Sequence, residues 1–162
     1  MPYEMKVDGM AEISEVLEKL EEKAPKVASG ALYEGAGVMA DEIRKGAAAI
    51  KTAPFRYAGR GETRLPSPEE KEIVLGAVAG IAKFRKNGPE VDTSVGLQSS
   101  GYAQLKKKTV PVPVIANAIN SGTSFMKKQP FFRKAASDGG KRAMEIMKAV
   151  IEKNFEELTN NK

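Results

Sequence analysis

The sequence predicts an α+β fold in which several helices pack on a small antiparallel sheet. Apolar residues recur at helical spacing along the first half of the chain and again near its end, whereas apolar and polar residues alternate in the middle. Separate helical and extended stretches of this kind are typical of α+β proteins. Because one hydrophobic core commonly serves about 100–200 residues, we expect the 162 residues to form a single domain over 1–162.

Two helices are expected at the N-terminus. The first begins near Met10 and carries apolar residues at i, i+3, i+4 and i+7, until Pro25 ends it or opens the next helix. The second helix is expected over residues 26–49. It contains several glycines, among them Gly35, and each glycine lowers helix stability by up to about 1 kcal/mol relative to alanine. A helix that keeps such small residues is expected to pack closely against another element, within the subunit or across an interface.

Residues 51–66 predict a long basic loop. Arg56, Arg60 and Arg64 lie four apart among glycines. The glycines around Arg60 lack the preceding strand and the Gly-Lys-Ser/Thr ending of a phosphate-binding loop, so that chemistry is not expected here. A connection of this length suggests a functional or an assembly role.

A third helix and then a strand are expected after this loop. Ser67 begins a Ser-Pro-Glu-Glu run, which supplies a capping serine, a proline at the first helical position and a glutamate at the third. The apolar stripe after it predicts a helix as far as Phe84. Alternating residues from Val91 to Leu97 predict a half-buried strand. A second extended run over residues 109–114 carries two prolines, which confine it to a sheet edge or a polyproline-like extension.

The last helix is expected over residues 130–158. Pro130 suits its first turn, and the Gly139-Gly140 pair invites a kink or a break. Beyond the glycines, apolar residues at helical spacing predict an inward-facing stripe. Residues 159–162 are expected to form a frayed tail.

The residue types that are missing limit the chemistry. The chain has no Cys, which excludes disulfides and thiolate nucleophiles, and no His, which removes the Ser-His-Asp triad and the commonest metal ligand. We therefore expect a protein that is not an enzyme and holds no cofactor or metal. A Mg²⁺-dependent hydrolase that uses Asp41, Glu70 or Asp92 is a further alternative, although solvated surface explains these carboxylates. No apolar run approaches the roughly 18–20 residues that cross a bilayer, so no membrane association is expected.

Charge is unevenly distributed along the chain. Residues 1–24 contain three Lys or Arg against seven Asp or Glu, a balance of −4, whereas residues 51–136 contain fifteen against six, a balance of +9. This asymmetry indicates a polyanionic neighbour or a matched contact between subunits, although a solvated basic surface would give the same pattern. The residues expected to contact a polyanion or a partner are Arg56, Arg60, Arg64, Lys106, Lys107, Lys108, Lys127 and Lys128. The alternative function that region 51–136 leaves open is nonspecific nucleic-acid binding.

The stretch from Gly122 to Arg133 joins a Gly-Thr turn to the start of the last helix and is rich in phenylalanine. Adjacent residues on a helix point in different directions, so at most one of Phe131 and Phe132 is expected to face the core fully. The other, together with Phe125, has to contact a loop, the sheet or a neighbouring subunit. The candidate interaction residues are Gly122, Thr123, Phe125, Pro130, Phe131, Phe132 and Arg133.

The order of two N-terminal helices, a β region, a Gly-Thr turn and a Pro-Phe start to a long helix resembles a family of bacteriophage proteins. These are the small tail-component proteins of tailed double-stranded-DNA phages, called head–tail joining or tail completion proteins. Members tend to show an acidic-aromatic-Gly-Thr turn and then Pro-Phe-aliphatic-Arg-x-Ala. Residues 120–125, Asn-Ser-Gly-Thr-Ser-Phe, and residues 130–135, Pro-Phe-Phe-Arg-Lys-Ala, occupy these places. The Asn-Ser pair departs from the family's Glu-Phe, and Thr52-Ala53-Pro54 only faintly echoes its Ala-Pro-x-x-Thr-Gly segment.

The resemblance implies a structural virion protein encoded by a phage or a prophage. Such a protein would lie in the tail or neck of the virion, and in the bacterial cytoplasm during assembly. It would form a homo-oligomer, for which a ring is one arrangement. It would contact head-completion or tail-tube proteins and would lie close to DNA. The family brings no catalytic residues.

Overall fold

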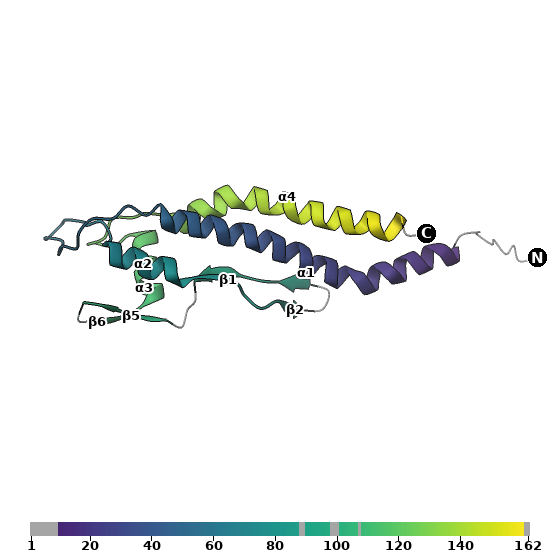
Figure 1. Ribbon diagram of the computed structural model, residues 1–162, viewed down its shortest axis with the longest axis horizontal. Coiled ribbons are helices and arrows are strands. Elements are labelled where there is room, and N and C mark those ends of the chain that lie inside the picture. Colours follow the sequence, from purple (N-terminus) through teal and green to yellow (C-terminus); the bar gives the residue numbers. More distant parts are fainter. Residues whose placement is uncertain (1–9, 88–89, 98–100, 107, 161–162) are drawn as a thin grey trace, which may run out of the picture.

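The chain forms an elongated α+β molecule, as the sequence predicts. The computed structural model describes residues 10–87, 90–97, 101–106 and 108–160. Two long helices, α1 (Met10–Ala48) and α4 (Phe131–Asn160), lie antiparallel and side by side, and the strands and α2 lie on the other side of α1 (Figure 1). The shorter elements are α2 (Pro68–Ala77), β1 (Val78–Ile81), β2 (Arg85–Asn87), β3 (Glu90–Asp92), β4 (Val95–Leu97), β5 (Tyr102–Leu105), β6 (Lys108–Pro111) and α3 (Val112–Ser121).

The N-terminal helical region is one element rather than two. α1 continues through Pro25, so the predicted boundary at this residue is wrong, whereas the predicted end near residue 49 is confirmed. Proline inside a helix removes one backbone hydrogen bond and costs about 3 kcal/mol. Packing against α4 offsets this cost, because α1 and α4 are in extensive contact. The purple N-terminal part of α1 is bent relative to the rest (Figure 1).

Helix α2 begins as predicted but ends early. Ser67 Oγ accepts a hydrogen bond of 3.2 Å from the Glu70 N–H, and the Glu70 carboxylate accepts one of 2.7 Å from the Ser67 N–H, which completes the capping box. The predicted continuation to Phe84 is wrong, because the chain becomes extended at Val78 and forms β1. Pairing of β1 with β4 and burial of Val78 outweigh the helical spacing of the sequence.

The strands are antiparallel, as expected, and in the described part of the chain they form three small two-stranded sheets. β1 pairs with β4 and β2 pairs with β3, so β1 and β2 run antiparallel to β3 and β4. Between the two pairs, the Ala82 N–H donates a hydrogen bond of 2.9 Å to the Ser94 carbonyl. The strand predicted from Val91 to Leu97 is therefore divided into β3 and β4. The third sheet is a hairpin of β5 and β6.

Helix α3, which follows β6, was not predicted. The extended run expected over residues 109–114 ends at Pro111, and the helix begins at the next residue. Pro113 lies in the first turn of α3, where its missing N–H would have had no helical partner. The buried residues of α3 are Val112, Ile115, Ala116 and Ile119. The residues at the start of α3 fit both an alternating strand pattern and a helical spacing. The helix forms because it buries its apolar side in the core.

Helix α4 confirms the prediction of a long C-terminal helix. It runs through Gly139 and Gly140 as one element, so the break that this pair suggested does not occur. It also continues through Asn160, two residues into the predicted tail, and residues 161–162 lie outside the described part.

Glycines allow α1 and α4 to approach each other closely. A Cβ on Gly139 would lie 3.0 Å from Glu42 Cγ, and a Cβ on Gly35 would lie 2.6 Å from Met147 Cγ. Such distances are shorter than normal carbon–carbon contacts, so larger residues at either position would push the helices apart. The expectation that small residues in the N-terminal region support tight packing within the subunit is confirmed at Gly35.

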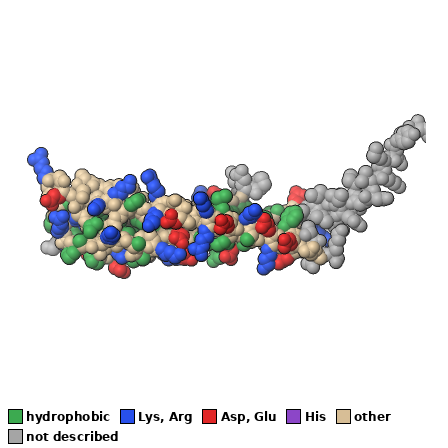
Figure 2. Space-filling view, turned by 90° about the horizontal axis from the view of Figure 1, so that it is seen from above, with side chains coloured by type: hydrophobic (Ala, Val, Ile, Leu, Met, Phe, Trp, Pro, Cys, Tyr) green, Lys and Arg blue, Asp and Glu red, His purple; other side chains and the backbone are tan. Residues whose placement is uncertain are grey.

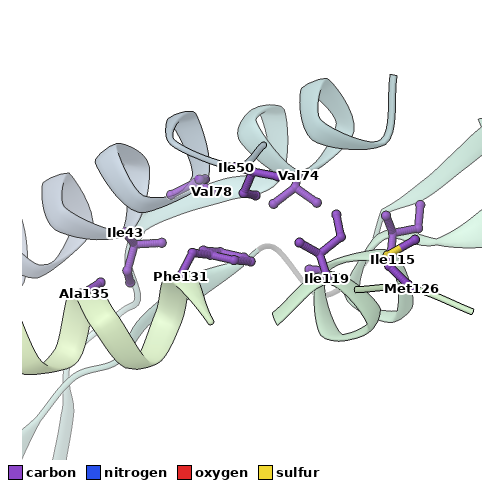
Figure 3. Packing of buried hydrophobic residues seen from close by; sticks show 11 residues of the cluster. Ile43, Ile50, Val74, Val78, Ile115, Ile119, Met126, Phe131 and Ala135 are labelled. Atoms are coloured by element: carbon purple, nitrogen blue, oxygen red, sulfur yellow. The ribbon is translucent and has the colours of Figure 1, made fainter. Parts of the chain in front are cut away.

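The hydrophobic core lies where α1, α2, α3, β1 and the start of α4 meet, at the end of the molecule opposite the C-terminus (Figure 1). Phe131 points from the first turn of α4 into the space between Ile50, just after α1, and Ile119 of α3 (Figure 3). The buried cluster consists of Ile43, Ala47, Ile50, Val74, Val78, Ile115, Ala116, Ile119, Met126, Phe131 and Ala135. This core fixes the position of the segment that leads from α3 to α4.

Candidate interaction site

The Gly-Thr turn gives the segment between α3 and α4 its shape. Gly122 ends α3 with a φ of +78°, which favours glycine, and a Cβ there would lie 2.9 Å from Lys128 Cβ. Thr123 Oγ1 accepts hydrogen bonds from the N–H groups of Met126, at 3.0 Å, and Phe125, at 3.3 Å. The predicted turn is therefore confirmed at both residues, and each holds it through a different local contact.

The three phenylalanines are divided between the core and the surface. Phe131 is buried, and Phe132 packs partly buried against the core with its ring centroid 4.5 Å from that of Phe131. Phe125 is 50% exposed. Pro130 and Arg133 are exposed as well. The prediction that only one of the adjacent phenylalanines faces the core fully is confirmed, and Phe125 is the ring that stays available for a partner.

Two side-chain amides that the sequence did not single out hold this segment in place. The Gln129 side chain accepts a hydrogen bond of 2.8 Å from the Lys51 N–H and donates one of 2.9 Å to the Lys51 carbonyl. Asn120 Oδ1 accepts a hydrogen bond of 3.1 Å from the Phe132 N–H, at the start of α4. Gln129 and Lys51 are 78 residues apart, so no local pattern identifies this contact.

Arg64 is a structural residue, and its prediction as a polyanion contact is wrong. Its guanidinium donates hydrogen bonds of 2.6 Å and 2.5 Å to the two carboxylate oxygens of Glu70, and both side chains are buried. Its backbone forms a bridge to the turn segment, because its N–H bonds to the Phe125 carbonyl and its carbonyl accepts from the Lys127 N–H. Because the guanidinium is buried and paired with Glu70, it is not free to contact a phosphate.

This pairing also determines how both groups ionise. Burial opposes the charged form of Glu70, but hydrogen bonds from Arg64 and Ser67 outweigh that effect and lower the pKa of the Glu70 carboxyl below its ordinary value of 4.5. The hydrogen bonds to Glu70 raise the pKa of Arg64, against the opposing effect of desolvation. Both groups are therefore charged near neutral pH.

The other predicted basic residues differ in their environments. Arg56 forms an exposed ion pair of 3.1 Å with Glu62, whereas Arg60 is exposed and has no ion pair with a described residue. Lys106 Nζ lies 3.4 Å from the centroid of the Phe55 ring, a cation–π contact. Lys108 is exposed, and the remaining lysine of this run, Lys107, lies outside the described residues.

A groove of about 720 Å³, which we call the aromatic groove, lies between the 51–66 loop, the β5–β6 hairpin, α3 and the turn segment. It is lined by Phe55, Tyr57, Ala58, Arg64, Glu70, Leu105, Lys106, Lys108, Val110, Val114, Ile115, Ala118, Phe125 and Met126. The buried pair of Arg64 and Glu70 forms part of its lining, and two exposed lysines accompany an otherwise apolar surface. The structure thus brings Phe125 together with the basic residues 106 and 108.

A second groove of about 660 Å³, which we call the lysine groove, lies between the end of α1 and the start of α4. Its charged lining residues are Glu42, Lys45, Lys51, Lys127, Lys128, Lys134 and Asp138. Two of its lysines, Lys127 and Lys128, belong to the predicted contacts, and Lys134 follows them closely in the sequence. The other two, Lys45 and Lys51, lie at or just beyond the end of α1, which the sequence did not connect with them. On the face that α4 forms, basic and acidic side chains are interspersed along the length of the molecule, with hydrophobic ones between them (Figure 2).

The carboxylates considered for Mg²⁺ do not converge. Asp41 pairs with Arg44 at 3.0 Å, Glu70 is held by Arg64, and Asp92 lies 4.0 Å from Arg85. In the part of the chain that the structure describes, no three acidic side chains are grouped so as to hold a metal ion. The same part contains no helix with the length and apolar character needed to cross a membrane.

Comparison with known proteins does not identify the chain. No family model, curated protein or solved structure matches it. The resemblance to phage tail-component proteins therefore remains a prediction from the sequence.

Proposed function

We propose that this protein is a structural part of the tail or the head–tail connector of a tailed bacteriophage or prophage, and that it acts by associating with other subunits rather than by catalysis. The observation that carries the proposal is the set of exposed hydrophobic side chains at the aromatic groove. Tyr57 is 84% exposed, Val114 56% and Phe125 50%. Single exposed hydrophobic residues are common, but several of them around one groove are typical of an interaction site.

The charge around the aromatic groove favours an acidic, partly apolar partner segment. Lys106 and Lys108 line the groove, and the first 24 residues of the chain carry a balance of −4. The start of α1 lies at the other end of the elongated molecule from the β5–β6 hairpin (Figure 1). A contact between the acidic end of one copy and the groove of the next would be head to tail. Contacts of that kind close into a ring or continue as a filament.

The resemblance of residues 120–125 and 130–135 to tail-component proteins supplies the class of assembly. We expect head-completion or tail-tube proteins as the other partners, in the virion tail or neck and, before that, in the bacterial cytoplasm. The absence of His and Cys from the sequence agrees with a role that needs no catalytic base or thiolate.

The test measures self-association with matched variants. Sedimentation velocity over a concentration series, with electron microscopy of the products, would compare the wild type with a Tyr57→Ser/Phe125→Ser variant. Tyr33→Ser is the control, because Tyr33 is 57% exposed on α1 and does not line the groove. One aromatic residue at the centre of an interface contributes about 2 kcal/mol or more, which is about 30-fold in affinity. With two such residues removed, we expect association of the groove variant to weaken by roughly 30-fold to 1,000-fold and that of the control to stay unchanged.

Equal association of both variants would show that the groove is not the interface. If the wild type stays monomeric, the same variants are tested for binding to the products of the neighbouring genes, which should include portal, major tail or tape-measure proteins. A gene neighbourhood without virion genes, or turnover of a substrate by the pure protein, would overturn the proposed function.

A further inference from the structure

The lysine groove combines basic residues from three separate parts of the chain. Lys45 lies in the last turn of α1 and Lys51 just beyond it, Lys127 and Lys128 precede α4, and Lys134 lies in its first turns. Only Glu42 and Asp138 are acidic among the lining residues. The lining therefore has five positive and two negative side chains. These residues form one surface although they are separated in the sequence.

Most of these positive charges are not neutralised by the protein. Lys45 Nζ lies 2.8 Å from Glu42, which is also 3.7 Å from Arg142, so the carboxylate of Glu42 is already shared. The other four lysines of the groove are exposed and make no ion pair with a described residue. Like charges that are brought together without counter-charges attract anions from solution.

The backbone that carries the four lysines is held in place, although their ammonium groups are exposed. The Gln129 side chain binds both backbone groups of Lys51, at 2.8 Å and 2.9 Å. The Lys127 N–H donates a hydrogen bond of 2.8 Å to the Arg64 carbonyl, and the Lys134 N–H donates one of 3.1 Å to the Pro130 carbonyl. The convergence of charge is thus set by the fold and needs no ordering of a loop when a ligand binds.

We propose that the lysine groove binds the phosphate groups of duplex DNA without preference for sequence. An ammonium group binds phosphate as a point charge and carries no base-specific information. The aromatic ring that lines this groove belongs to Phe131, which is only 4% exposed, so it is not available to stack on a base. The lysines thus offer point-charge contacts to the phosphate backbone, and the Gln129 amide of the lining is already engaged with the Lys51 backbone.

This inference is independent of the proposed assembly function, because the lysine and aromatic grooves share no lining residue. If four lysines each neutralise one phosphate, the logarithm of the binding constant should fall with the logarithm of salt concentration with a slope of about −3.6. Binding should then weaken roughly 150-fold between about 50 and 200 mM NaCl.

Fluorescence anisotropy of a labelled duplex of mixed sequence provides the test. The groove variant replaces Lys51, Lys127, Lys128 and Lys134 by Gln, and the control variant replaces Lys26, Lys83, Lys86 and Lys153, which are exposed and do not line the groove. Both variants lose the same net charge. We expect the groove variant to bind at least about 30-fold more weakly than the control at 50 mM NaCl and to lose most of the salt slope, while association through the aromatic groove stays intact.

Three results would overturn the inference. Absence of duplex binding by the wild type at 50 mM NaCl would do so directly. Equal weakening in both variants would mean that net charge alone, and not the groove, attracts the DNA. Competition by polyglutamate as strong as that by an unlabelled duplex would mean that the groove recognises acidic polypeptide instead of phosphate.

Discussion

The buried pair of Arg64 and Glu70 should be among the most costly contacts to break. Glu70→Ala removes the hydrogen bonds of 2.6 Å and 2.5 Å from the Arg64 guanidinium and the capping bond of 2.7 Å from the Ser67 N–H. It also leaves the guanidinium without its counter-charge in a residue that is 7% exposed. Removing one partner of a buried ion pair costs about 3–5 kcal/mol, so we expect Glu70→Ala to lower the free energy of unfolding by that amount.

Urea unfolding at neutral pH, followed by circular dichroism, measures this loss. Glu69→Ala is the matched control, since Glu69 is the exposed neighbour in the same helical turn and its loss should change stability by at most about 0.5 kcal/mol. The double variant Arg64→Met/Glu70→Met removes both charges and should be more stable than Glu70→Ala. A cost of less than about 1 kcal/mol for Glu70→Ala, or a double variant less stable than the single one, would refute the reasoning.

The remaining predictions concern the ionisation of Glu70, two glycines and two phenylalanines. Because the pKa of Glu70 is lowered from 4.5, the contribution of its carboxylate to stability should be complete above pH 4.5 and should be lost as the pH falls through the lowered pKa. In urea unfolding between about pH 3 and 7, the free energy of unfolding should therefore decline less steeply with falling pH for Glu70→Gln than for the wild type. Gly122→Ala should lower the free energy of unfolding by about 1–3 kcal/mol, because φ is +78° at this residue. Gly37→Ala should raise it by up to about 1 kcal/mol, because Gly37 lies in α1 and a new Cβ would have no atom within 4 Å. Thermal unfolding should therefore show shifts of opposite sign for the two variants. Phe131→Ala should lose about 3–5 kcal/mol and Phe125→Ala at most about 0.5 kcal/mol in urea unfolding, and similar losses would contradict their division between core and surface.

Local features of the sequence were predictable because their partners lie a few residues away. The capping box at Ser67 connects residues three apart, and its geometry is as expected. The turn at Gly122 and Thr123 is likewise closed by neighbouring groups. The long C-terminal helix was recognisable from its apolar spacing, which a single helix requires wherever one of its sides is buried.

Apolar spacing alone was misleading where two structures fit the same residues. The stripe from Ile73 onward suits a helix, yet Val78 begins β1 because β4 is available to pair with it. Residues 109–114 alternate like a strand, yet Val112 begins α3 because its helical face completes the core. In both cases the choice depends on a partner element, so a local pattern cannot make it.

The candidate site was predictable only in part, for the same reason. The sequence predicted Phe125, Lys106 and Lys108 as contact residues, and the fold collects them at one groove. It also grouped Arg64 with Arg56 and Arg60 as a basic loop, although Arg64 turns inward to Glu70. Charge spacing describes which residues are basic, whereas burial and the position of a carboxylate determine which of them remain free.

The sequence by itself determined the elements whose hydrogen bonds close within a few residues: the capped start of α2, the Gly-Thr turn and the course of α4. It also excluded chemistry that needs a Cys or a His side chain, because the sequence contains neither. Only the tertiary structure decided that Lys51 and Lys127 line one groove and that Glu70 neutralises Arg64. The energy of such contacts depends on distance and burial in three dimensions, and neither is written in the order of residues along the chain.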